Sequence, residues 1–327
     1  WKYVVICSAG IALAFLGTVL LNYTSQHSGG PSGLNFVDLT AGAAQLNPGV
    51  ARIAVVLLVI GFGTKAGLAP LHAWLPDAHS QAPAPVSALM SGVLLSVAFY
   101  AILRVKVVAD AALGADFARE LLGVIALVTL LVSASLLLAQ QDYKRMLAYS
   151  SMEHMGLVAL GAAVGSKLAI AAVLLHILGH GLAKSVLFLG SGRMLQTTGT
   201  SRIQEVRGLL SRQPVLAGCF GAGILALIGF PPFSVFASEL GIIRAGFAAD
   251  MGWVTAVALL LVLVIAAALF AHTGRMLLGS TTGGAVRLPV ATTAALLAGL
   301  TACAVIGLIA WPLRELLDVA AGVVTGP

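Results

Sequence analysis

Lys65 is an ionisable residue inside an apolar stretch, residues 53–71. The helix that carries it must break just beyond, in residues 69–76, because proline frees backbone carbonyls that then need polar partners. The alternative is a lysine near a helix end that extends its amine to the membrane surface. A charge beside a broken helix is more typical of proteins that move ions across membranes. We therefore predict a proton or ion path at Lys65, and we include His72, which lies in the break.

His176, His180 and Lys184 follow one another at i, i+4 and i+8, which places all three on one helix face over a rise of ~12 Å. Three interpretations compete. A metal site would need further ligands, and Lys184 would repel a cation. The histidines could instead bond to backbone carbonyls. We favour a proton relay, because imidazole titrates near neutral pH, and we predict no metal site.

Glu239 follows a second predicted helix break, the double-proline segment 229–234. A carboxyl group among apolar residues is held partly in its neutral form, so it could hold or release a proton. The alternative is a carboxylate that has already reached the far membrane interface. Glu153 and His154 form a further polar pair, which could be a structural hydrogen-bond anchor or part of a conducting path.

The composition is that of an integral membrane protein. Of 327 residues, 59% are hydrophobic and 9% are charged, against about 25% charged residues in soluble domains. The net charge of +6 comes with no basic stripe interleaved with aromatic residues, so nucleic-acid binding is excluded. Cys7, Cys219 and Cys303 all lie in apolar segments without CxxC spacing, and we interpret them as packing residues.

A membrane-spanning helix needs about 20 apolar residues, and the sequence contains nine candidates. They are Tyr3–Leu21, Val50–Leu71 (broken), Pro85–Val107, Ala118–Ala139, Ser151–Val164 (short), Ala169–Met194, Pro214–Phe247 (broken), Trp253–Leu278 and Pro289–Trp311. We therefore predict an all-α, polytopic membrane helix bundle that forms a single transmembrane domain over residues 1–327. The polar residues 142–150 are expected at the surface before the fifth span. No soluble segment is long enough to bury a core, so this chain should hold no cofactor, and any redox cofactor must belong to a partner.

The chain starts at Trp1, directly before a helix and without an initiator methionine or a signal peptide. We interpret it as the remainder of a longer protein whose N-terminal helices are missing. Numbering the spans alternately places slightly more basic residues on the side where the chain starts. The densest basic cluster, residues 193–212, favours that side as the cytoplasmic one.

Two long motifs resemble a known family. The run KAGLAPLHAWLPDAH (65–79), which continues into APAPVSAL (82–89), resembles the signature of the antiporter-like subunits of respiratory complex I, group 4 membrane-bound hydrogenases and Mrp-type cation/proton antiporters. The run DYKRMLAYSSMEHMG (142–156) is similar to their second signature. Its SMEHMG part resembles the hydrogenase-4 component F type. The resemblance extends from the first helix to the helix after Glu239.

The resemblance implies a role for each candidate residue. Lys65 matches the family's lysine in the first broken helix, which takes and passes the proton. His176, His180 and Lys184 match the central histidine–lysine axis. Glu239 matches the acid or lysine of the second broken helix, which hands the proton toward the opposite side.

The sequence departs from the family in two places. Many members place a lysine or histidine in the third span, where this chain has Ser91 and Ser96, so water would carry the relay there and Ser96 is an accessory candidate. Full-length members have roughly fourteen helices, and the helix before the position of Trp1 carries a glutamate that pairs with the first lysine. That glutamate is not in this chain.

The resemblance implies a proton-translocating, multi-pass subunit in the inner (cytoplasmic) membrane that performs no bond-making chemistry itself. Its expected partners are other membrane subunits, lipids and a peripheral redox module, either a nickel–iron hydrogenase or a quinone-reducing arm. The alternatives are a Na⁺ or K⁺/proton antiporter subunit, a membrane subunit that energises inorganic-carbon uptake, and a scaffold without transport. The proteins that copurify with the chain would distinguish these functions.

Overall fold

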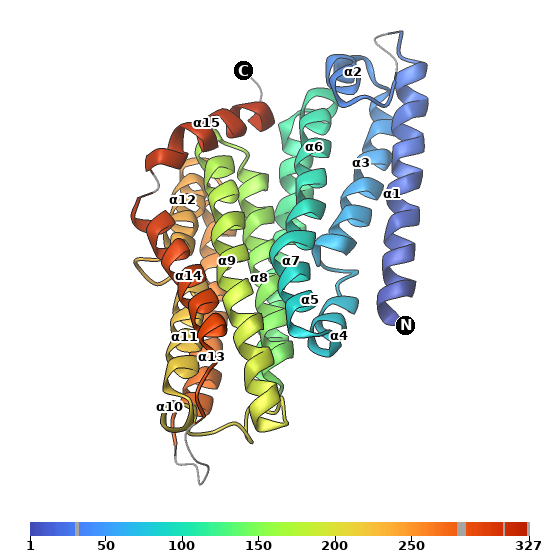
Figure 1. Cartoon of the computed structure of the whole chain (residues 1–327). Coiled ribbons are helices and arrows are strands. Elements are labelled where there is room, and N and C mark those ends of the chain that lie inside the picture. The colour runs from blue at the N-terminus through green and yellow to red at the C-terminus, as the bar shows by residue number, and fades with distance from the viewer. Residues whose placement is uncertain (30–32, 280–285, 310, 326–327) are drawn as a thin grey trace.

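The computed structural model describes residues 1–29, 33–279, 286–309 and 311–325, and within these ranges the chain forms helices joined by turns and loops (Figure 1). The helices are α1 (Lys2–Gln26), α2 (Phe36–Ala41), η1 (Ala43–Gln45), α3 (Pro48–Ala66), α4 (Trp74–Gln81), α5 (Ala84–Leu89), η2 (Met90–Leu94), α6 (Leu95–Leu113), α7 (Ala115–Leu138), α8 (Tyr143–Val164), α9 (Lys167–Thr198), α10 (Leu209–Arg212), α11 (Pro214–Leu227), α12 (Ser234–Ala248), α13 (Gly252–Leu277), α14 (Val290–Leu308) and α15 (Trp311–Thr325). Seven spans in the described residues, with α5 to α6 as one, are long and apolar enough to cross a membrane. The other two predicted spans correspond to α8 and to α11 with α12. The predicted all-α membrane bundle is confirmed.

The long helices run side by side, with α1 and α3 at one edge of the bundle and α11 and α14 at the other (Figure 1). The helices α8 and α9 lie between these edges. In α8 every residue except Arg145 and Tyr149 is buried, and a helix buried on all sides must form the centre of the bundle. The candidate residues on α8 and α9 are therefore at the protein's core rather than at its lipid-facing surface.

The expectation that residues 142–150 lie at the surface before a short span is wrong. Helix α8 begins at Tyr143, and Asp142 caps it by accepting a hydrogen bond from the Arg145 amide at 2.8 Å. Lys144 is buried and donates to the Ala82 carbonyl at 2.8 Å. The polar residues of this segment therefore provide hydrogen bonds inside the bundle, where an unpaired polar group would be costly.

Both predicted helix breaks are present, and nearby side chains satisfy the backbone groups of the first one. Helix α3 ends at Ala66, and Gly67, which follows it, has a left-handed backbone (φ 77°). The Trp74 indole donates to the freed Thr64 carbonyl at 2.7 Å, and the Ala69 amide donates to the Thr129 hydroxyl at 3.0 Å. The second break separates α11 from α12 and contains Gly229 (φ 68°).

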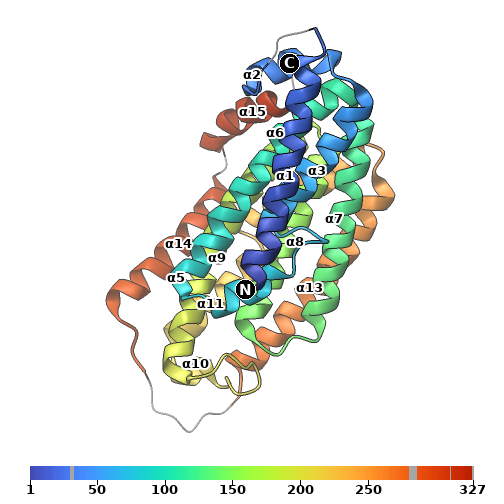
Figure 2. The same ribbon diagram turned by 90° about the vertical axis from the view of Figure 1, so that its right-hand side faces the viewer.

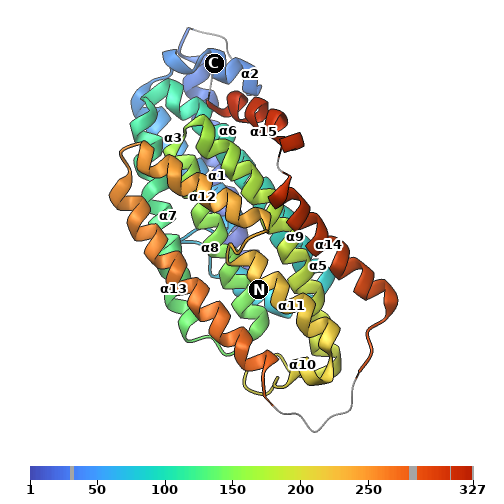
Figure 3. The same cartoon turned by 90° about the vertical axis from the view of Figure 1, so that its left-hand side faces the viewer.

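Helix α15 was not predicted, and neither were the short helices α2, α4 and α10. Helix α15 lies across the end of the bundle where α2 is found (Figures 2 and 3). Its buried residues Leu317, Ala321 and Val324 face inward, whereas Leu316 and Val319 are exposed. The last predicted span ends at Trp311, but α14 ends at Leu308. An amphipathic helix of this length is too short and too polar to be found by a search for apolar spans.

Small residues allow α1 and α3 to pack closely. A Cβ atom on Gly61 would lie 2.6 Å from the Ala14 amide nitrogen, and one on Gly10 would lie 2.7 Å from the Thr64 side chain. Glycines at such crossings let two membrane helices approach each other.

We expect Gly61→Ala to lower the thermal unfolding temperature of the purified protein, because the two backbones would have to separate at a cost of about 1–3 kcal/mol. The matched control is Gly218→Ala on α11, where an added Cβ would meet nothing within 4 Å. That control should be neutral or stabilising, because alanine favours a helix by about 0.5–1 kcal/mol over glycine. Equal behaviour of the two variants would contradict the close α1–α3 packing.

Candidate functional site

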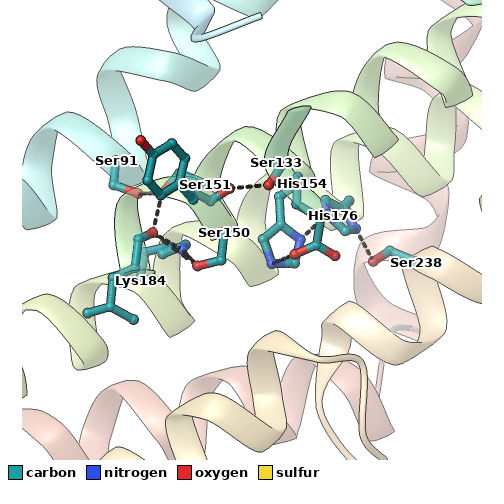
Figure 4. A network of polar contacts seen from close by, with 11 residues as sticks. Ser91, Ser133, Ser150, Ser151, His154, His176, Lys184 and Ser238 are labelled. Atoms are coloured by element: carbon teal, nitrogen blue, oxygen red, sulfur yellow. Dashed lines mark hydrogen bonds and ion pairs between the residues drawn. The ribbon is translucent and has the colours of Figure 1, made fainter. Parts of the chain in front are cut away.

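Lys184 is fully buried between α8 and α9, on the same face of α9 as His176 and His180. Its amine donates to the Leu147 carbonyl at 2.7 Å and to the Ser150 hydroxyl at 2.5 Å (Figure 4). Among the described residues no carboxylate forms an ion pair with it. Its position is thus fixed by neutral oxygen atoms of α8 alone.

His176 connects three helices. Its Nε2 lies 3.0 Å from Nδ1 of His154 on α8, and its Nδ1 lies 3.0 Å from the Ser238 hydroxyl on α12 (Figure 4). Ser238 donates in turn to the Val235 carbonyl at 2.8 Å. The predicted pair Glu153 and His154 is buried here, and His154 Nε2 lies 3.9 Å from the Glu153 carboxylate. A continuous hydrogen-bonded path therefore runs from α8 through α9 to α12.

His180 lies between the Lys184 contacts and the histidine pair but is bonded to neither. Its ring centroid is 4.9 Å from that of His154, and neither of its ring nitrogens has a hydrogen-bond partner among the described residues. Because neither nitrogen is engaged, the neutral His180 ring can still donate from one nitrogen and accept at the other.

Glu239 lies beside the second helix break and close to the histidine pair. One carboxylate oxygen of Glu239 and one ring nitrogen of each of His154 and His176 lie within 4.8 Å of one another. Its Oε1 atom is buried and has no partner in the described structure. The side chain borders a cavity of about 250 Å³ whose other lining residues include Leu157 and Phe236. The carboxylate therefore lies at the level of the histidines on α8 and α9 and beside the break.

Lys65 occupies a different place, at the edge of the bundle. Its amine donates to the Tyr3 hydroxyl at 2.9 Å and lies 4.4 Å from the centre of that ring. His72 is half-buried, and its Nδ1 has no partner in the described residues. Ser96 on α6 donates to the Gly92 carbonyl of η2, about one turn earlier in the same span, at 3.2 Å. No described hydrogen bond joins these three side chains to the histidines.

His79 and several serines were missed as site residues. His79 on α4 is fully buried, and its Nδ1 lies 2.9 Å from the Leu75 carbonyl. Its ring centroid lies 5.7 Å from that of Phe188, which is one turn beyond Lys184 on α9. Ser91 bonds to Ser151 at 2.8 Å, between η2 and α8. His79 could have been identified from the sequence, because it is the last residue of the motif KAGLAPLHAWLPDAH (65–79). The partners Ser150 and Ser238 could not be found by spacing, because they lie on other helices.

The family is decided by comparison with known proteins. The profile of the family described as NADH:quinone oxidoreductase/Mrp antiporter, TM, matches residues 2–267. The chain belongs to this family. A hydrogenase-4 component F homolog of Methylacidiphilum infernorum (isolate V4) is 41% identical over 250 residues, which are 76% of this chain and 52% of that protein. NADH-quinone oxidoreductase subunit N of Desulforudis audaxviator (strain MP104C) is 38% identical over 251 residues, covering 75% and 49%. This chain thus spans about half the length of these relatives.

Solved structures show the same fold in this family. A chain of an archaeal membrane-bound sulfane sulfur reductase superposes with a TM-score of 0.91 at 29% identity, covering 99% of this chain and 65% of that one. A chain of respiratory complex I from Thermus thermophilus with bound NADH gives 0.87 at 27% identity, covering 100% and 69%. The resemblance stated from the two motifs is therefore confirmed.

We expect Ser150→Ala to destabilise the protein by about 1–3 kcal/mol, because it removes one of the two partners of a buried amine. The matched control is Ser135→Ala, since Ser135 is exposed and bonds only to the Leu131 carbonyl of its own helix. In a Lys184→Met background the cost of Ser150→Ala should largely disappear, and thermal unfolding of the four variants measures this coupling. An unchanged cost would show that Ser150 does not act through Lys184.

Proposed function

We propose that this chain is a proton-translocating subunit of a redox-driven complex in the inner membrane of its cell. The observation that supports this most directly is the buried line of titratable and hydroxyl groups from Lys184 to Glu239. It contains His154, His176 and Ser238 at hydrogen-bond distances. Buried titratable groups are costly in a membrane protein, and they are typical of proton relays. The names of the relatives, a hydrogenase component and a quinone oxidoreductase subunit, support a redox-driven complex.

The proton enters the relay at the first broken helix and leaves it at the second. Lys65 on α3 holds the proton on the entry side. We assign the step from that region to Lys184 to His79 on α4, whose ring lies 5.7 Å from that of Phe188, one turn beyond Lys184 on α9. The histidine pair receives the proton on α8 and α9. Glu239, within 4.8 Å of both histidines, passes it on beyond α12. Ordered water bridges the longer steps, because the breaks provide polar backbone groups to hold it.

His180 acts as the gate of this relay. An imidazole with two free nitrogens can accept a proton on one and donate the other, so a rotation of its ring connects Lys184 to His154. While the His180 ring has no hydrogen bond, Lys184 is not connected to the His154–His176 pair, so protons do not pass between them. Charges in a low-dielectric interior interact over longer distances than in water. Protonation of Lys65 or Lys184 therefore changes which protonation state is favoured at the next group of the relay. The redox reaction in a partner subunit supplies the first charge movement.

Replacing the terminal carboxyl tests the direction of transfer. In liposomes that contain the whole complex, Glu239→Gln should reduce redox-driven proton transport at least tenfold, because the amide can neither accept nor release the proton. Glu239→Asp, shorter by one methylene, should keep part of the activity. A pH-sensitive dye measures the rate, and the matched control is Glu120→Gln, an exposed carboxylate on α7. Full activity of Glu239→Gln would refute the role. Transport that requires Na⁺ or K⁺ would instead indicate a cation/proton antiporter.

Gly229 should be needed for the position of the Glu239 carboxylate. A Cβ atom on Gly229 would lie 2.1 Å from Glu239 Oε2, whereas one on Gly199 would meet nothing within 4 Å. Both glycines have left-handed backbones, so alanine costs about 1–2 kcal/mol at either position. We expect similar losses of thermal stability from Gly229→Ala and Gly199→Ala. Only Gly229→Ala should reduce proton transport several-fold, because it displaces the carboxylate. Equal losses of transport would contradict this.

A further inference from the structure

The histidine pair and Glu239 form a set of ligands that the sequence pattern did not indicate. A metal site through His176 and His180 on one helix was an alternative that the sequence did not favour, and the donor atoms that converge come from three helices instead. They belong to His154 on α8, His176 on α9 and Glu239 on α12, and all lie within 4.8 Å of one another. Two imidazoles and one carboxylate are a common ligand set of zinc, with a water molecule as the fourth ligand.

The distance between the two imidazoles suits a metal ion. His154 Nδ1 and His176 Nε2 are 3.0 Å apart, and at this distance they share a proton. Two nitrogens bound to tetrahedral zinc at about 2.0–2.1 Å lie about 3.3 Å apart, so the metal replaces the proton after a small shift. The carboxylate, whose ligand atom lies within 4.8 Å of both nitrogens, has to move closer by a rotation of the Glu239 side chain. No hydrogen bond to its Oε1 in the described structure opposes this rotation.

Several groups around the three ligands can orient and neutralise a bound dication, and they oppose the repulsion from Lys184, which lies two turns beyond His176 on α9. The second nitrogen of His176 is held by Ser238 at 3.0 Å, and such outer hydrogen bonds orient the histidines of metal sites. Glu153 lies 3.9 Å from His154 Nε2, so two carboxylates can balance the charge of the metal. The site is unsuited to Ca²⁺, which takes six to eight oxygen ligands, and to Mg²⁺, which takes octahedral oxygen ligands.

We propose that His154, His176 and Glu239 bind a divalent transition-metal ion of the Zn²⁺ class, and that the bound ion blocks the relay. Metal and proton compete for the same nitrogen atoms, so the occupied site cannot pass protons. The binding follows from the ligand geometry alone, and the block rests on the proposed function.

Metal binding is measured directly on the purified complex, without turnover. Elemental analysis after incubation with ZnCl₂ and excess MgCl₂, and visible absorption after addition of CoCl₂, should both give one site per chain. His154→Gln, His176→Gln and Glu239→Gln should each weaken binding at least tenfold. The matched control is His272→Gln, because His272 is buried on α13 and bonds to the Leu137 carbonyl outside this set. Ser238→Ala, which keeps all three ligands, should weaken binding about tenfold.

Different results would overturn the metal site, the block of the relay and the proposed function. No tetrahedral Co²⁺ spectrum in the wild type, or equal binding by His154→Gln and His272→Gln, would refute the site. Zinc that binds without slowing proton transport would refute the block. A metal-free complex that transports no protons would refute the proposed function and leave the metal site standing.

Discussion

The buried amine of Lys184 is the constraint on which the centre of this structure depends. A charge or donor in the membrane interior needs polar partners, and here both partners are oxygen atoms of α8, the Leu147 carbonyl and the Ser150 hydroxyl. Helix α8 must therefore be polar and yet enclosed by its neighbours on all sides. This explains why it lies in the middle of the bundle and why its sequence is less apolar than that of the other spans.

The helix breaks follow from the same requirement. Each break frees backbone groups that lipid cannot satisfy, so the protein supplies partners from neighbouring helices. The Trp74 indole and the Thr129 hydroxyl do this at the first break. At the second break, Gly229 leaves room for the Glu239 carboxylate, which a side chain at this position would displace. Polar groups thus occur where the bundle can enclose them.

The sequence predicted the features that depend on neighbours along the chain. Apolar length gave the spans, the prolines gave both breaks, and the i, i+4 spacing placed His176, His180 and Lys184 on one face. It could not predict contacts that depend on how two packed helices are rotated. The His154–His176 contact and the Ser238 contact are of this kind. The polar start of α8 was misjudged for a related reason, since polarity alone does not distinguish an exposed segment from a hydrogen-bonded core.

The arrangement of donor atoms that suits a proton relay at His154, His176 and Glu239 also suits the binding of a metal ion. A relay needs two imidazole nitrogens at hydrogen-bond distance with a carboxylate nearby, and these are the donors that Zn²⁺ prefers. The separation of 3.0 Å between His154 and His176 is close to what either occupant needs. A Glu239 carboxylate farther from the histidines would protect the site from metals, but it would also lengthen the proton transfer from the histidines to Glu239. Selectivity for protons must then come from access, since the cavity beside Glu239 is lined mostly by apolar residues, which admit a hydrated dication poorly.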